Sequence, residues 1–133
     1  MYNAGDESET LNGWEIKDNN SDSHIISGDL IVAAGDYAVL CRNDDAEVNG
    51  GLICDYEYSG FVLANTKDEI ILEDENSSEK DRVDYDTDFP YDAGYSAELK
   101  DPSLDNNNKD NWEGASETDI YGDGDHGTPG ASN

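Results

Sequence analysis

Two oxygen-rich loops near the end of the sequence carry the side chains best suited to binding a metal. Asp105 and Asn107 lie in one loop, and Asp123 and Asp125 lie in a second loop rich in glycine. Hard cations such as Ca²⁺ take several oxygen ligands from flexible loops, so these four residues are calcium candidates. The second loop does not continue into an EF-hand, because no glutamate stands at the required position. Solvated acidic loops without a metal explain the same residues, and no other cofactor is expected.

The remaining residues do not form a recognisable group of catalytic side chains. His24 and His126 lie in different polar contexts and lack the spacing of a metal-binding helix motif. Ser21 and Ser23 could join His24 and one of the many aspartates on paper, but no nucleophile elbow accompanies them. Pairs of carboxylates arise by chance in so acidic a chain. The sequence therefore predicts that the protein is not an enzyme.

The two cysteines, Cys41 and Cys54, have neither the spacing nor the histidine neighbours of a zinc or redox motif. Cys41 closes the inward row of one predicted strand, 37–41, and Cys54 opens the inward row of the next, 54–58. If these strands are neighbours or face one another, both side chains point into the same space, where a disulfide is geometrically reasonable. We predict this disulfide, with two buried free thiols as the alternative.

The elements that must position these residues are short β-strands. Helical periodicity is missing, and short apolar stretches alternate with clusters of Gly, Asn, Asp and Ser. Residues 37–41 predict a strand buried on both faces, and residues 54–58 a half-buried antiparallel strand. Further strands are expected at 69–73, 82–86 and 95–99. Strands at this density without helices indicate an all-β sandwich or barrel.

Length and composition predict a single domain over residues 1–133, in which 100–133 form an irregular closing segment rich in Asn, Asp and Gly. The net charge of −26 could favour disorder. However, the chain has two Trp, eight Tyr and two Phe, and acidic disordered tails are poor in such residues. We therefore expect a folded domain.

The negative charge also excludes classes of partner. Nucleic acid and anionic membranes are bound by clustered Lys and Arg, and the chain has no such cluster. No apolar run is long enough for membrane insertion. Divalent cations, basic surfaces and neutral glycans remain plausible partners. Acidity spread along the whole chain also suits a halophilic or marine setting.

Three segments share a pattern at a characteristic spacing. Residues 11–18 contain Leu-Asn-Gly-Trp, residues 35–40 contain Gly-Asp-Tyr, and residues 96–133 contain Asn-Trp and end in Gly-Thr-Pro-Gly-Ala-Ser-Asn. Together they resemble the lamin tail domain family of the secreted bacterial or archaeal type, over nearly the whole chain. The resemblance implies an immunoglobulin-like β-sandwich, a secreted, extracellular or cell-surface location, and no catalytic residues. Trp14, Tyr37 and Trp112 are then expected as core anchors.

One departure from the family pattern affects the expected fold. Family members begin with an additional strand, whereas this sequence starts at the last two residues of that pattern, Tyr2 and Asn3. We expect the opening strand to be missing, which leaves an open sheet edge. Either a dimer or a partner chain completes the sandwich, or the segment 2–10 takes over the edge. Marginal stability is a third possibility, if the sequence is a truncated reading of a longer gene.

Two classes of function are left open. The first is a non-catalytic extracellular accessory, binding or structural module, which can form part of a larger secreted or surface protein. The second is a carbohydrate-binding module, or a calcium-stabilised adhesion module, attached to a secreted hydrolase. A row of exposed aromatic rings would favour sugar binding, whereas their burial would favour the first class; the rings in question are Tyr56, Tyr58, Phe61, Phe89 and Tyr91.

Overall fold

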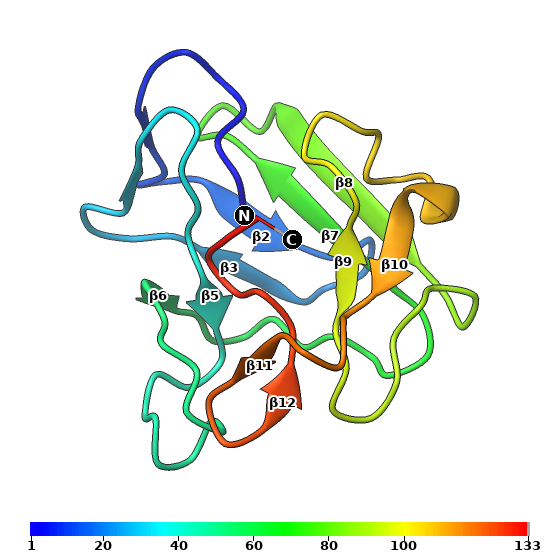
Figure 1. Cartoon of the computed structure of the whole chain (residues 1–133). Coiled ribbons are helices and arrows are strands. Elements are labelled where there is room, and N and C mark those ends of the chain that lie inside the picture. The colour runs from blue at the N-terminus through cyan, green and yellow to red at the C-terminus, as the bar shows by residue number, and fades with distance from the viewer. Residues whose placement is uncertain (133) are drawn as a thin grey trace.

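This computed structural model describes residues 1–132, in which every regular element is a β-strand except for one 3₁₀ turn (Figure 1). In chain order they are β1 (Glu9–Thr10), β2 (Glu15–Lys17), β3 (Ser23–Ile25), β4 (Ile31–Val32), β5 (Leu40–Cys41), β6 (Tyr56–Glu57), β7 (Asp68–Glu73), β8 (Glu79–Tyr85), β9 (Ala97–Leu99), η1 (Lys109–Asn111), β10 (Trp112–Gly114), β11 (Ile120–Tyr121) and β12 (Asp125–His126). An antiparallel four-stranded sheet forms one layer, and two-stranded pairs form the other. The predicted all-β, immunoglobulin-like sandwich is confirmed.

The four-stranded sheet has the order β3-β2-β7-β8. β7 lies inside the sheet because its apolar run 70–72 suits a strand with neighbours on both sides. β8 is an edge strand, and charged residues such as Lys80 and Arg82 make that edge a poor template for another chain. The strands predicted at 69–73 and 82–86 are therefore present, and β8 begins earlier than predicted.

The turn between β7 and β8 is held by one carboxylate. Asp74 Oδ1 accepts the backbone N–H groups of Asn76 at 2.8 Å and Ser78 at 3.0 Å. Its second oxygen lies 2.9 Å from Lys80 Nζ. Ser77, between these contacts, has a φ of +59°, which a non-glycine residue adopts mainly in tight turns. The hydrogen bond from Lys80 is the main reason that the pKa of Asp74 is lowered.

In the second layer β5 and β6 pair in parallel, with Leu40 opposite Tyr56. The antiparallel arrangement predicted for residues 54–58 is therefore wrong. A parallel pair needs a connection of roughly a dozen residues or more, and the polar segment 42–55 is long enough to return the chain to the start of β5. The predicted alternation itself is confirmed, because residues 54, 56 and 58 are half-buried whereas 55 and 57 are exposed.

The opening segment lies antiparallel to the strand that leads into β5. Tyr2 forms a bridge with Tyr37, their ring centroids lie 4.8 Å apart, and the Met1 carbonyl accepts the Ala38 N–H at 2.9 Å. Further along, β1 pairs with β4. Segment 2–10 thus pairs with parts of the segment 31–38, which is one of the predicted outcomes. Tyr37 is half-buried against Tyr2 and lies outside the main apolar cluster.

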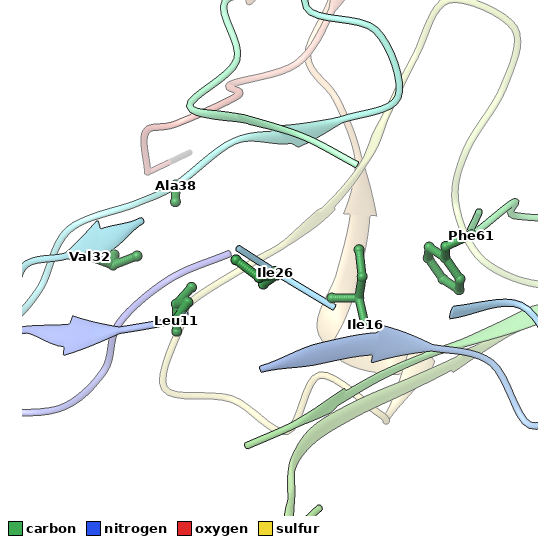
Figure 2. Packing of buried hydrophobic residues seen from close by; sticks show 6 residues of the cluster. All are labelled: Leu11, Ile16, Ile26, Val32, Ala38 and Phe61. Carbon is green, nitrogen blue, oxygen red and sulfur yellow. The ribbon is translucent and has the colours of Figure 1, made fainter. Parts of the chain in front are cut away.

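The core lies between the layers. Figure 2 shows six buried side chains that come together from β2, β4 and the segments beside the strands, namely Leu11, Ile16, Ile26, Val32, Ala38 and Phe61. Trp14 packs against this cluster and keeps part of its surface exposed, as do Tyr58 and Leu72. Trp14 is therefore a core anchor at the edge of the cluster, in line with the prediction.

Trp112 anchors a second apolar cluster. Its ring lies 5.6 Å from Phe89, and its Nε1 donates to the Asn106 carbonyl at 2.8 Å. Phe89 is buried and meets Tyr85 of β8 edge-on at 6.4 Å. The closing segment, expected to be irregular, is thus tied to the sheet and also contains β10, β11 and β12. Its last residue, Asn133, lies outside the described residues.

Candidate functional site

The calcium candidates belong to two different loops. Asp105 accepts the N–H of Asn107 at 3.0 Å, and Asn107 Oδ1 accepts the N–H of Asp84 at 2.7 Å. Asp123 and Asp125 belong to the β11–β12 hairpin. Within residues 1–132, no group of three or more His, Cys, Asp or Glu side chains is placed to hold a metal ion. Calcium binding therefore stays a prediction.

The two histidines make packing contacts. His24 Nε2 lies 2.8 Å from the Tyr56 hydroxyl, and its Nδ1 lies 2.9 Å from the Ser59 carbonyl. Both ring nitrogens are thus engaged without a serine hydroxyl or a carboxylate. The His126 ring stacks on Tyr95 at 4.1 Å, and its Nδ1 is buried without a hydrogen-bond partner in the described part of the chain. Neither arrangement is that of a nucleophile and its base.

The predicted disulfide between Cys41 and Cys54 is present, with the two Cα atoms 6.0 Å apart. It closes the base of the loop between them. Inside that loop the Asn49 amide donates to the carbonyls of Asn43 at 2.8 Å and Leu52 at 2.9 Å. These bonds replace the regular hydrogen bonds that a loop lacks, so the loop has a defined shape.

The same loop presents two apolar side chains to solvent and packs against the closing hairpin. Val48 and Ile53 are 68% and 84% exposed. Asp123 donates its N–H to the Gly50 carbonyl at 2.8 Å. A Cβ on Gly122 would lie 2.0 Å from that carbonyl oxygen, so this close approach requires glycine. The loop and the hairpin thus form one ordered end of the molecule.

The aromatic rings considered for sugar binding do not form an exposed row. Phe61 and Phe89 keep only 2% and 7% of their surface exposed, whereas Tyr91 is 39% exposed. Tyr58 is half-buried, with its ring centroid 5.8 Å from that of Phe61. Tyr56 is half-buried too, and its hydroxyl is engaged in hydrogen bonds. A flat sugar platform needs several exposed rings, and this set offers one.

A mostly apolar cavity of about 1080 Å³ lies between the four-stranded sheet and the second layer. This volume is far larger than the voids of a packed interior and suits a ligand or a peptide side-chain row. Both Met1 and Ser132, at the two ends of the described chain, line it. Side chains from both layers complete its wall, among them Ile16, Ile70, Leu72, Leu40, Leu99 and Trp112.

An unpaired stretch of backbone lies on the wall of this cavity. The ladder of the opening segment ends where the Met1 amino group donates to the Ala38 carbonyl at 2.9 Å. Successive residues of a strand direct their backbone groups to opposite sides, so Leu40 faces the same side as Ala38. The Val39 carbonyl faces the other way and accepts the Tyr56 N–H at 3.2 Å. No described residue pairs with the Leu40 N–H or carbonyl on the open side.

The electrostatics at the end of this ladder are set by burial and by carboxylates. Burial lowers the pKa of the Met1 amino group, and the negative charges of Asp55 and Asp81 act in the opposite direction. Both carboxylates thus add negative potential at the amine. A cationic group is therefore favoured there over an anionic one.

Sequence reasoning found the disulfide but not the cavity or the open position at Leu40. It placed Leu40 in a strand buried on both faces and predicted an open edge without locating it.

Comparisons with known proteins agree with this architecture. A family model described as Lamin Tail Domain matches residues 1–87 of the 133-residue chain, a range that includes β1 to β8. No curated protein and no solved structure matches the chain. Among residues 1–132, no helix has the length and apolar character to cross a membrane.

Proposed function

Since this chain belongs to the lamin tail domain family, we propose that it is a non-catalytic accessory, binding or structural module of a secreted or cell-surface protein. The observation that carries the proposal is the Cys41–Cys54 disulfide. Disulfides persist in oxidising surroundings such as the cell exterior and are rare in the cytosol. This bridge fixes a loop with two exposed aliphatic side chains, Val48 and Ile53, as suits a module that presents loops to a partner.

The charge of the chain supports the same class of function. A net charge of −26 keeps a protein hydrated and soluble in salty surroundings. It disfavours nucleic acid and anionic membranes as partners, because both need clustered basic residues. Basic or neutral protein surfaces are compatible with it.

A protein partner is favoured over a glycan. The burial of Phe61 and Phe89 removes two of the five rings that could have formed a sugar platform. Of the five rings, Tyr91 is the most exposed, and its hydroxyl donates to the Asn65 carbonyl at 2.9 Å. A single ring with an engaged hydroxyl offers little area for stacking on a sugar.

Location and thiol state in the source cells test the export part of the proposal. Antibodies against the chain would follow it through medium, surface and cytoplasmic fractions, with alkylation before any reductant is added. We expect the protein in the medium or surface fraction with both cysteines protected from alkylation. A cytoplasmic protein with two alkylated thiols would overturn the proposal.

The choice of partner class is tested separately on a glycan array. We expect no sugar to be retained above the background of a Tyr91→Ala variant. Retention that this variant abolishes would establish the carbohydrate-binding alternative.

A further inference from the structure

Two exposed turns of the four-stranded sheet carry an asparagine that is followed two residues later by a serine. In the turn between β2 and β3 these residues are Asn19 and Ser21. In the turn between β7 and β8 they are Asn76 and Ser78. Asn-x-Ser, with any residue except proline in the middle, is the acceptor sequence for N-linked glycosylation of secreted proteins. No other asparagine in the sequence starts this pattern, so the chain has two candidate acceptors.

The two turns have the same construction, in which an aspartate at the first position holds the backbone. Asp18 Oδ1 accepts the N–H groups of Asn20 at 2.7 Å and Asp22 at 3.2 Å. Asp74 Oδ1 accepts the N–H groups two and four residues later in the same way. The side chains of Asn76 and the residues after it are therefore not needed to hold the turn in shape.

The side chains of the second turn are the more accessible of the two sets. Asn76 and Ser78 are exposed, and among residues 1–132 neither the Asn76 amide nor the Ser78 hydroxyl has a hydrogen-bond partner. Asn19 is exposed too, but Arg82 Nη1 of the neighbouring strand β8 lies 3.5 Å from its Oδ1. An unengaged amide with an unengaged hydroxyl two residues later is what a glycosyl-transferring enzyme requires of its acceptor. Asn76 therefore fits this role better than Asn19.

We propose that Asn76 is an N-glycosylation site, which takes an oligosaccharide from a lipid-linked donor when the chain is exported. In this transfer a bond forms between Asn76 Nδ2 and the anomeric carbon of the first sugar. The bond between that carbon and the phosphate oxygen of the lipid breaks. Nδ2 loses one proton, and the lipid phosphate departs with the electron pair, so neither an oxidant nor a reductant is needed. The proposal rests on the proposed function, because the modification belongs to secreted proteins.

The place of Asn76 in the fold suits a bulky group. The turn between β7 and β8 lies at the opposite end of the molecule from β11 and β12 (Figure 1). The loop that presents Val48 and Ile53 packs against that distant hairpin, through the bond from the Asp123 N–H to the Gly50 carbonyl. A glycan on Asn76 would thus leave this loop uncovered. It would also shield the start of the edge strand β8 from pairing with another chain.

Tryptic peptides of the protein purified from the source cells separate the two candidate acceptors. Cleavage after lysine and arginine releases residues 68–80, with Asn76, and residues 18–42, with Asn19. Mass spectrometry of the intact peptides after reduction should show added sugar mass on 68–80, and fragmentation should place it on Asn76. A peptide 68–80 of unmodified mass, whether or not 18–42 carries sugar, would overturn the proposal.

Variants of the turn, produced in the same cells, test whether the acceptor sequence is what directs the modification. Ser78→Ala and Asn76→Gln should each remove the sugar mass from peptide 68–80, whereas Ser78→Thr should retain it. Ser77→Gly is the matched control, because it also removes one exposed hydroxyl, suits the φ of +59° and should leave the sugar in place. Sugar that persists in Ser78→Ala would belong to a serine-linked glycan and would overturn the proposal.

The location of the protein distinguishes failure of this proposal from failure of the proposed function. An unmodified Asn76 on a protein that is exported and disulfide-bonded would overturn the glycosylation site and leave the proposed function in place. An unmodified Asn76 on a cytoplasmic protein with two free thiols would overturn both.

Discussion

Removal of the Cys41–Cys54 bridge should destabilise the domain by an amount that follows from its place in the chain. The two cysteines have a sequence separation of 13. Closing a loop of that length in the unfolded chain corresponds to about 3 kcal/mol at 25 °C. In a domain of this size, that loss lowers Tm by roughly 10–15 °C. The effect is large because small domains are stable by only about 5–15 kcal/mol.

Urea unfolding of three samples separates the stability contributed by the disulfide bond from the stability contributed by packing of the sulfur atoms. The samples are the oxidised protein, the reduced protein, and the Cys41→Ala, Cys54→Ala double variant. Reduction retains both sulfurs, so the oxidised and reduced samples should differ by the loop term alone. The double variant should lose somewhat more, because Cys41 is buried. A difference below about 1 kcal/mol between the oxidised and reduced samples would refute the reasoning, since the loop would then be restrained without the bridge.

Further predictions concern the core, one carboxylate and the net charge. Phe61→Ala should reduce the unfolding free energy in urea by about 3–5 kcal/mol because Phe61 is buried in the core. Ile53→Ala, at an exposed position, should change it by less than about 0.5 kcal/mol, and equal losses would contradict this view of the core. The pKa of Asp74 is lowered in the folded state, chiefly by the hydrogen bond from Lys80. The stability that this carboxylate contributes to the fold is therefore present above its ordinary pKa of 3.8. It is lost as pH falls through the lower pKa of the folded state. Asp74→Asn should therefore flatten the decline of the urea midpoint below about pH 4, whereas Asp29→Asn, at an exposed site, should show the same decline as the wild type. Tm should rise with sodium chloride, because salt screens the −26 charge, and calcium chloride at matched ionic strength should give the same Tm; an additional rise with calcium would reveal a specific site.

The strands that could be predicted from the sequence are those with an apolar pattern long enough to read. The apolar run 70–72, flanked by Glu69 and Glu73, lies in β7. The alternation of 54–58 predicts which of its side chains are half-buried. The parallel direction of β6 could not be predicted, because alternation within a strand carries no information about its partner. Strands such as β3 and β11, with two or three residues each, are too short for any periodicity to show.

The disulfide could be predicted from residues close together in the sequence, whereas the cavity could not. Cys41 and Cys54 could be paired because the two predicted strands lie side by side, as the pairing of β5 with β6 confirms. The predicted shared row was wrong, because Leu40 and not Cys41 lies opposite Tyr56. The cavity is lined by Leu40, Leu99 and Trp112, which come from segments far apart in the chain. Only the folded arrangement shows that Tyr2 lies opposite Tyr37 and that Met1 pairs with Ala38.

The open edge at Leu40 is tested most directly by amide hydrogen exchange measured by NMR on the oxidised monomer. The Ala38 amide donates to Met1 and should exchange slowly, whereas the Leu40 amide, without a partner, should exchange much faster. A Leu40 amide as protected as that of Ala38 in the free monomer would contradict the open edge, because its N–H would already have a partner.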